Sequence, residues 1–224
     1  MKILLFGGSG VLGSELLKID PEIIAHSHRY ADIIDRHKIA VLFDIYKPEI
    51  IINCAAQTDN RKIEKTPTSA IMSNIIGAAN ITLFCVLHNI RYVYISTDYV
   101  YPGTKGNYSE TDDINPINQY AWTKLGGECS ARQVKNHLII RTSFCDKFPH
   151  SVAWENQYTS KEWVDIVAKK IYKASTSNIC GVMNIGSQRK SMLEFARERK
   201  PDIKSAINPL NIDTSMISKY DEIK

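Results

Sequence analysis

The chain has 224 residues, of which 44% are hydrophobic and 23% charged, which is enough for one substantial core or a core with a small appendage. This composition excludes a disordered tail, a collagen-like repeat and a disulfide-stapled miniprotein. The 28 Lys and Arg residues give a formal charge of +4 against 24 Asp and Glu, but they are spread along the chain without a nucleic-acid-binding motif. We therefore expect a globular protein with no nucleic acid partner.

Apolar runs and cysteine usage bear on the cellular compartment. No apolar run approaches the ~20 residues that span a bilayer, and the apolar stretch Ile3–Phe6 is too short for a signal peptide. The cysteines are odd in number and form no CxxC pair, so we expect buried free thiols and no metal site at Cys54, Cys85, Cys129, Cys145 and Cys180. These features predict a cytoplasmic protein without a membrane partner.

Short apolar runs alternate with longer helical patterns, which is typical of βαβ units in a parallel sheet. Strands are expected at residues 2–6, 22–25, 49–53, 91–95, 137–141 and 181–185. Helices are expected at residues 11–18, 35–46, 67–88, 118–135, 161–173 and 192–199, with N-caps at Asp35, Thr66 and Ser160. Residues 98–117 are rich in Gly and Pro and should form an irregular loop. The fold class predicted is α/β, a Rossmann-type doubly wound parallel sheet.

A glycine-rich turn joins the first expected strand to the first helix. Gly7, Gly10 and Gly13 follow a GxxGxxG spacing. The first glycine permits a tight turn, the second lets the backbone approach a pyrophosphate, and the third allows the helix to pack close to the sheet. Glycines gather in turns of every kind, but between a first strand and a first helix this triplet predicts dinucleotide binding.

The end of the second strand bears on the choice of cofactor, because NAD enzymes tend to place an acidic residue there. Here the chain reads His26, Ser27, His28 and Arg29, with neither Asp nor Glu. A hydroxyl followed by cationic groups favours the 2′-phosphate of NADPH. NADH stays open, because the same residues could form a solvated loop.

A Tyr and a Lys lie four residues apart on an expected helix and so project from one face. This pair, Tyr120 and Lys124, precedes the fifth strand, while Thr97 follows the fourth strand at the edge of the sheet where ligands bind in open α/β folds. Reduction of a carbonyl needs a proton donor and a second hydrogen bond for the oxygen. We expect Tyr120 to donate the proton and Thr97 to bond the carbonyl oxygen. Lys124 would lower the pKa of the phenol toward neutrality and hold the nicotinamide ribose.

These motifs together resemble an extended short-chain dehydrogenase/reductase, and the local strings resemble nucleotide-sugar 4-ketoreductases of the dTDP-4-dehydrorhamnose reductase type. The resemblance is carried by residues 47–58 (KPEIIINCAAQT), 95–101 (ISTDYVY), 120–128 (YAWTKLGGE), 141–143 (RTS) and 208–215 (NPLNIDTS). It is continuous over roughly residues 1–144 and patchy beyond. The resemblance implies reduction of a nucleotide-linked 4-keto-6-deoxy sugar by NADPH, and it allows a homodimer.

The resemblance also implies roles for particular positions. Gly10, Val11 and Leu12 would meet the pyrophosphate, and Thr97, Asp98 and Phe144 would face the sugar. The remaining cofactor positions would lie at the adenine (Asp32 and Ile33) and along the ribose and nicotinamide (Ala55, Ala56 and Gln57). Asn74 would be the structural or proton-relay asparagine of the superfamily.

Departures from related enzymes separate the candidate reactions. A 4,6-dehydratase would carry Glu after Thr97-Asp98, and a bifunctional 3,5-epimerase/4-reductase would carry Cys there, whereas this chain has Tyr99. Reduction alone is therefore favoured, with Cys145 or His150 as an alternative epimerase acid/base. A cofactor-binding regulatory subunit is the rival from another functional class.

The expected domains follow from the same comparison of motifs. Residues 1–141 should form the Rossmann core, with residues 161–185 returning to the sheet. Residues 142–160 and 186–224 should form a small substrate-binding lobe. Candidates to line its pocket, or simply to pack, are Trp154, Asn156, Gln157, Tyr158 and Ser160.

Overall fold

The computed structural model describes residues 1–220, and its centre is a sheet of six parallel strands. In spatial order the strands are β2 (Ile24–Ala25), β1 (Ile3–Phe6), β3 (Ile50–Asn53), β4 (Arg91–Thr97), β5 (His137–Thr142) and β10 (Gly181–Ile185). The strand order reverses beside β1, so the sheet is doubly wound, as predicted. Each predicted strand is present, although the second is reduced to two residues.

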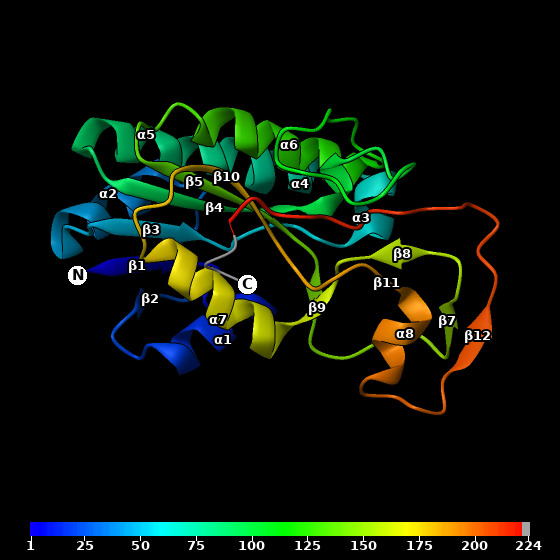
Figure 1. Ribbon diagram of the computed structural model, residues 1–224. Helices are drawn as coiled ribbons and strands as arrows, with labels where there is room; N and C mark the ends of the chain where they lie inside the picture. The colour runs from blue at the N-terminus through cyan, green and yellow to red at the C-terminus, as the bar shows by residue number, and fades with distance from the viewer. Residues whose placement is uncertain (221–224) are drawn as a thin grey trace.

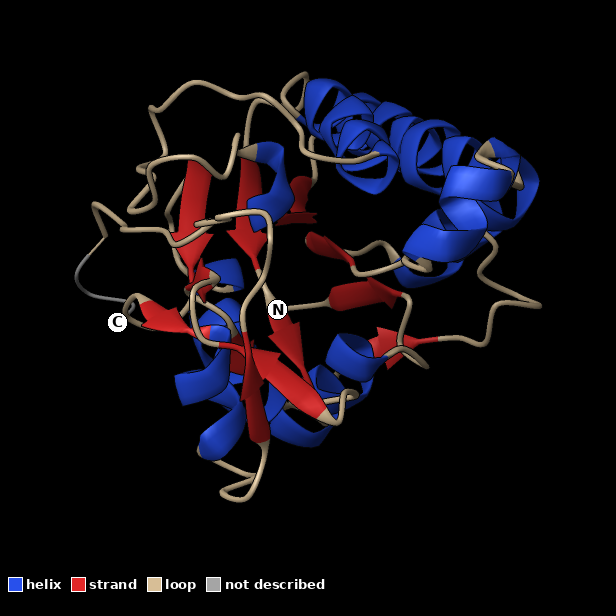
Figure 2. Cartoon of the chain, turned by 90° about the vertical axis from the view of Figure 1, so that its right-hand side faces the viewer, coloured by secondary structure: helices blue, strands red, loops and turns tan. Residues whose placement is uncertain are grey.

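Helices cover both faces of the sheet (Figures 1 and 2). On one face lie α1 (Val11–Ile19) and α7 (Val164–Ser175), which pack against each other. On the other lie α2 (Arg36–Tyr46), α5 (Ala78–His88) and α6 (Gln119–Ala131). Alternate residues of β1 enter opposite cores: Ile3 and Leu5 join the α1–α7 side, and Leu4 and Phe6 join the other. This two-sided burial explains why the strand is a continuous apolar run.

Beyond β5 the chain forms short elements at one end of the sheet, on the right of Figure 1. These are β6 (Phe144–Cys145), β7 (Val152–Trp154), β8 (Tyr158–Thr159), β9 (Glu162–Trp163), β11 (Lys190–Ser191), α8 (Met192–Arg197) and β12 (Lys204–Ala206). The C-terminal segment then runs back toward the core, where Met216 forms a β-bridge with Tyr108. Residues 221–224 of the expected lobe lie outside the described residues.

Three expectations about helix starts need correction. The segment expected to be one helix over 67–88 is preceded by a helix that was not predicted, α3 (Asn60–Lys65), and it contains α4 (Thr68–Ala70) and the π-helix η1 (Ile71–Gly77) before α5. Thr66 is the C-cap of α3 and not the N-cap of the following helix, where Pro67 holds that position. Helix α7 was expected from residue 161 but starts at Val164. Ser160 does not cap it, because the Ser160 hydroxyl bonds to the backbone of Met216. Asp35 does cap α2, through the N–H groups of His37 and Lys38.

The helical stretch Thr68–His88 shows that the expectation of no apolar run near the length of a membrane span was wrong. Its 21 residues are long and apolar enough to cross a membrane by length and composition. Its inner face, which includes Ala78, Ile81 and Cys85, lies in the core against the sheet. A helix that packs against a buried parallel sheet is apolar because one of its faces lies in the core. The apolar composition of this stretch is therefore weak support for a membrane span.

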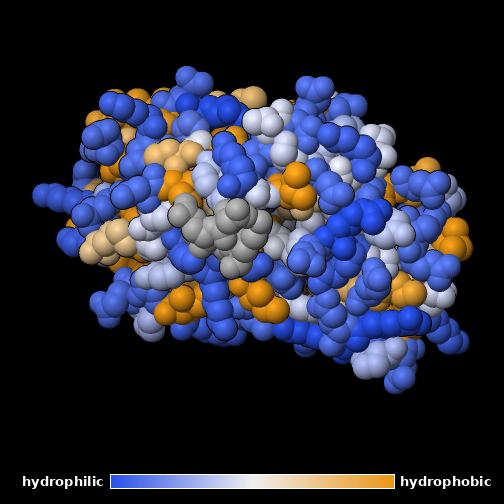
Figure 3. Space-filling view, viewed as in Figure 1, coloured by the Kyte–Doolittle hydropathy of each residue, from blue (hydrophilic) through white to orange (hydrophobic). Residues whose placement is uncertain are grey.

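The cysteines are free, but they are not all buried: Cys85 is buried, Cys54 and Cys145 are half-buried, and Cys129 and Cys180 are exposed. The face seen in Figure 3 is mostly hydrophilic, with apolar side chains scattered over it. Residues 1–220 hold no group of three or more His, Cys, Asp or Glu side chains that could bind a metal ion.

Candidate active site

A cavity of about 450 Å³ lies at the carboxyl ends of β1, β3, β4 and β5. Parallel strands end at the same edge of a sheet, so residues far apart in the sequence meet there. The predicted site residues that line it are Gly10, Val11, Leu12, Gly13, Ala56, Thr97, Asp98, Tyr120, Lys124 and Phe144. The predicted proton donor, the predicted lysine and the start of the glycine-loop helix therefore share one cavity.

The glycine loop has the geometry that its spacing predicts. Gly7 has a φ of +84°, and a Cβ there would lie 2.6 Å from the backbone nitrogen of Ala55. A Cβ at Gly13 would lie 2.2 Å from the Gly7 carbonyl oxygen, so the helix can approach the turn only with glycine at this position. Gly10 is the N-cap of α1, and no side chain caps this helix. Its first N–H groups are thus available to an anion in the cavity.

The residues after β2 lie outside the cavity. Ser27, His28 and Arg29 form an exposed loop, where the Arg29 guanidinium lies 5.7 Å from the ring centre of Tyr30. Asp32 caps its own turn by accepting the N–H of Ile34. Ile33 is buried beneath Gly77, where a Cβ would lie 2.5 Å from it, and so it packs the helix layer.

Asn74 acts as a structural brace and does not line the cavity. Its side chain accepts the N–H of Gln57 at 2.8 Å and donates to the Gln57 carbonyl oxygen at 2.9 Å. It also donates to Thr123 Oγ1 at 2.9 Å, and that hydroxyl donates to the Tyr120 carbonyl oxygen. Asn74 therefore ties the Ala55–Gln57 loop to the helix that carries Tyr120. Of that loop, Ala56 reaches the cavity.

Thr97 and Asp98 lie where β4 ends. Thr97 Oγ1 accepts the N–H of Tyr99 and donates to Asp98 Oδ1, both at 3.2 Å. The other oxygen of Asp98 accepts the hydroxyl of Thr214 at 2.9 Å. Burial raises the pKa of Asp98, while the charge of Lys161 opposes this shift. The closing motif of the chain thus returns to hold an active-site carboxyl group.

Tyr120 and Lys124 lie one turn apart near the start of α6, which Asn118 caps through the N–H of Ala121. Burial raises the pKa of Tyr120, and the negative charges of Asp98 and Tyr99 raise it further. The expectation that Lys124 lowers the pKa of Tyr120 toward neutrality is therefore wrong. Burial instead lowers the pKa of Lys124 to about 8. At neutral pH both groups keep their protons, as a proton donor and its neighbouring ammonium require.

Several cavity residues were missed from the sequence. Lys161 comes from the turn between β8 and β9, and Thr58 and Asn60 come from the loop after β3. Thr58 ends the string at residues 47–58, but Asn60 and Lys161 lie outside the motif strings, so tertiary contacts alone reveal these two. The hydroxyls of Ser96 and Thr142, buried at the cavity wall, have no hydrogen-bond partner among residues 1–220. Buried hydroxyls of this kind are ready to bond a ligand.

The lobe candidates pack and do not line the cavity. Asn156 donates to the Asn208 carbonyl oxygen, Gln157 accepts from the Asn208 side chain, and the Arg189 guanidinium stacks 3.6 Å from the Tyr158 ring centre. Trp154, in β7, and Ser160 are also absent from its wall. Cys145 does line it, whereas His150 does not. Burial raises the pKa of Cys145, so it remains a thiol at neutral pH.

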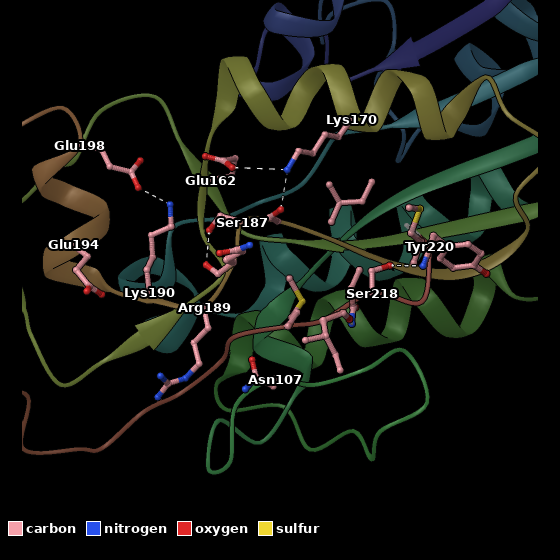
Figure 4. Close-up of a pocket in the computed structure, with 17 residues that line it drawn as sticks. Asn107, Glu162, Lys170, Ser187, Arg189, Lys190, Glu194, Glu198, Ser218 and Tyr220 are labelled. Atoms are coloured by element: carbon pink, nitrogen blue, oxygen red, sulfur yellow. Dashed lines mark hydrogen bonds and ion pairs between the residues drawn. The ribbon is translucent and has the colours of Figure 1, made fainter. Parts of the chain in front are cut away.

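A larger cavity of about 880 Å³ lies between α7, α8 and the C-terminal segment (Figure 4). Its charged side chains are paired within the described residues. Lys170 donates to the Gly186 carbonyl oxygen and faces Glu162, and Lys190 pairs with Glu198. Arg189 pairs with Asp213, and Glu194 accepts the N–H of Ser191. This cavity contains none of the predicted catalytic residues.

A family model described as the RmlD substrate binding domain matches residues 1–146. The chain belongs to this family. A dTDP-4-keto-6-deoxy-D-glucose reductase from Streptomyces niveus is 35% identical over 148 residues, which cover 63% of this chain and 51% of that protein. The chain thus spans about half the length of the curated relatives it matches. The resemblance inferred from the sequence motifs is confirmed.

Solved structures of the RmlD family show the same fold over nearly the whole chain. A hypothetical dTDP-4-dehydrorhamnose reductase from Sulfolobus tokodaii has a TM-score of 0.85 at 28% identity, covering 96% of this chain and 92% of that one. The dTDP-4-dehydrorhamnose reductase from Bacillus anthracis, solved in complex with NADP, has a TM-score of 0.84 at 25% identity, covering 100% and 91%. The predicted Rossmann-type fold is confirmed.

Proposed function

We propose that this chain is an NADPH-dependent reductase of a nucleotide-linked 4-keto-6-deoxy sugar. The observation that carries the proposal is the convergence of Thr97, Tyr120 and Lys124 in the cavity that also receives the N-terminus of α1. The sequence relatives named as reductases of dTDP-linked keto sugars and the structural relative solved with NADP support the same activity.

The residues of the cavity fit a dinucleotide. The uncapped N-terminus of α1 would bind the pyrophosphate through backbone N–H groups. The unpartnered hydroxyls of Ser96 and Thr142 and the ammonium of Lys124 offer further hydrogen-bond donors along the wall. Ser27, His28 and Arg29 follow β2, which pairs with β1, and would hold the 2′-phosphate from outside the cavity. NADH remains the alternative if these residues stay in solvent.

The reaction needs a hydride, which the reduced nicotinamide supplies when bound, and a proton for the carbonyl oxygen at C4. Tyr120 would donate the proton from its hydroxyl, since its raised pKa keeps it protonated at neutral pH. Thr97 would bond the same oxygen by turning its hydroxyl proton away from Asp98, and Phe144 would pack against the sugar. Lys124 would hold the nicotinamide ribose and stabilise the phenolate that forms as the proton leaves.

A substrate panel tests this function directly. We expect NADPH absorbance to fall when the protein is mixed with a dTDP-linked 4-keto-6-deoxy sugar, and to fall more slowly with NADH. Product NMR then separates reduction at C4 from epimerisation, for which Cys145 is the candidate thiol among the two cysteines, Cys54 and Cys145, that line the cavity. Binding of NADPH without turnover of any keto sugar in a panel of dTDP, UDP, CDP and GDP derivatives would indicate the regulatory subunit instead.

Two glycine substitutions test the cofactor loop. A Cβ at Gly10 would have a single close neighbour, the Gly7 carbonyl oxygen at 3.3 Å, whereas one at Gly13 would lie 2.2 Å from that atom. We expect Gly10→Ala to fold normally but to bind NADPH roughly tenfold more weakly, because the methyl group lies where the pyrophosphate would approach. We expect Gly13→Ala to lose about 1–3 kcal/mol of stability by overpacking. NADPH fluorescence titration and urea unfolding measure the two effects, and unchanged NADPH affinity in Gly10→Ala would contradict the assigned role.

A further inference from the structure

The ammonium of Lys124 lies in the candidate active site without an anionic partner. Only 3% of the residue is exposed, and it lines the cavity. Among residues 1–220, neither an ion pair nor a hydrogen bond engages Nζ. A buried lysine usually needs a carboxylate or several acceptors to keep its charge. Another group must therefore hold this ammonium in place.

That group is an aromatic ring on the neighbouring strand. Lys124 Nζ lies 4.2 Å from the ring centre of Tyr94, which is in the middle of β4. A cation over the face of a tyrosine is attracted by the ring quadrupole, most strongly where water is excluded. Tyr94 is 1% exposed, so the contact is shielded from solvent.

Three contacts hold the ring of Tyr94 beneath the ammonium. Its hydroxyl donates to the Lys124 carbonyl oxygen at 3.3 Å. The same hydroxyl fills the space left by Gly127, where a Cβ would lie 2.1 Å from it. Tyr92, two residues earlier on the same face of β4, lies 6.2 Å away between ring centres. The ring therefore cannot move without displacing α6 or β4.

We propose that Tyr94 is a positioning residue for Lys124, whose ring face holds the ammonium at the floor of the active site in place of a carboxylate. A carboxylate would occupy N–H donors of Lys124, whereas a ring face leaves them free for the ribose hydroxyls and the developing phenolate of Tyr120. This role rests on the proposed reductase function, although the contact itself does not.

The charge of Lys124 depends on the groups that face it from each side. Cys54, at the end of β3, and Glu128, one turn along α6, both favour the ammonium, while burial opposes it and brings the pKa of Lys124 to about 8. Tyr120 lies one turn earlier on the same helix. The ring of Tyr94 adds to the groups that favour the charge, so removing the ring should lower the pKa of Lys124 further.

The test is a titration of Lys124 by NMR in protein labelled with 13C at the lysine ε-carbons, with Lys124→Met to assign the signal. In the native protein and in Tyr94→Phe, which keeps the ring, we expect the signal to titrate at the same pH, near 8. In Tyr94→Leu, which removes the ring, we expect the titration to move down by about one pH unit. In Tyr94→Leu, the pH at which the rate of keto-sugar reduction falls should move down by the same amount.

Tyr92→Leu is the matched control, because it removes a tyrosine ring from the same face of the same strand. Tyr92 packs against the Tyr94 ring but makes no contact with the ammonium, so we expect this variant to shift the Lys124 titration much less than Tyr94→Leu does. Thermal melting of each variant checks that it folds. An unchanged titration in folded Tyr94→Leu would overturn the proposal, and so would an equal shift in Tyr92→Leu. Should Tyr94→Leu fail to fold, Tyr94→Met supplies the ring-free test. Absence of keto-sugar reduction in the native protein would reject the proposed function and leave the NMR result standing.

Discussion

We expect Tyr120→Phe to reduce keto sugars about 10²–10⁴-fold more slowly than the native chain, because it loses the hydroxyl that we propose donates the proton. The ring stays in place, so the NADPH dissociation constant should change little. The loss should therefore appear in kcat with KM nearly unchanged. Single-turnover NADPH oxidation and fluorescence titration of NADPH measure the two quantities.

A suitable control for Tyr120→Phe lies two residues along the same helix. The side chain of Trp122 is 52% exposed and lies away from the cavity, so Trp122→Phe should keep full activity. Equal turnover in Tyr120→Phe and Trp122→Phe would exclude Tyr120 as the proton donor. That result would not change the conclusions about the fold or the proposed cofactor site.

The pH dependence follows from the same pair of residues. The pKa of Tyr120 is raised above its ordinary value, so the phenol keeps its proton throughout the neutral range. The pKa of Lys124 is lowered to about 8, and the ammonium is the form that would stabilise the phenolate in the proposed reaction. We therefore expect the rate to fall as the pH rises through about 8, and Lys124→Met to be slow without that fall. A rate that keeps rising to pH 9.5 would contradict this assignment.

The second large effect is expected on stability, at a buried ion pair between α6 and β5. Glu128 and Arg141 have fully buried side chains, and the guanidinium donates to both carboxylate oxygens, at 2.9 Å and 3.1 Å. Arg141 also donates to the hydroxyl of Tyr101 at 2.9 Å. Glu128→Gln would leave the guanidinium charged and buried. We expect it to lower the free energy of unfolding by about 3–5 kcal/mol in urea.

Two further variants show whether an unpaired charge causes that loss. Replacing both partners by Met should cost less than Glu128→Gln alone, because no charge is then left in the core. The pair between Asp165 and Arg199 is about half exposed, so Asp165→Asn should cost less than about 1 kcal/mol. A loss below about 1 kcal/mol in Glu128→Gln would show that the core tolerates the unpaired guanidinium.

The parts of the site that local sequence could predict are those whose chemistry lies in a short segment. Gly7, Gly10 and Gly13 predict the turn because strand, glycines and helix are adjacent in the chain. Tyr120 and Lys124 predict a shared face because a helix repeats about every four residues. Phe144, which the family resemblance implied would face the sugar, lies two residues beyond β5 and does line the cavity.

The failed predictions arise where distant partners compete for a residue. Ser160 has the character of an N-cap, but its hydroxyl bonds to Met216, 56 residues away. Local preference gives way there because a buried polar group needs a partner, wherever in the chain that partner lies.

The sequence by itself determined the α/β class, the glycine turn and the identity of the Tyr120–Lys124 pair, since each depends on periodicity or spacing within one segment. The family followed from the resemblance of several motif strings along the chain. Only the tertiary structure brought Lys161 to the cavity wall, Thr214 to Asp98, and the ring of Tyr94 beneath Lys124. It also separated Cys145, which lines the cavity, from His150, which does not. The reason is physical: parallel strands end at one edge of the sheet, and the residues that meet there are chosen by the packing of the whole core.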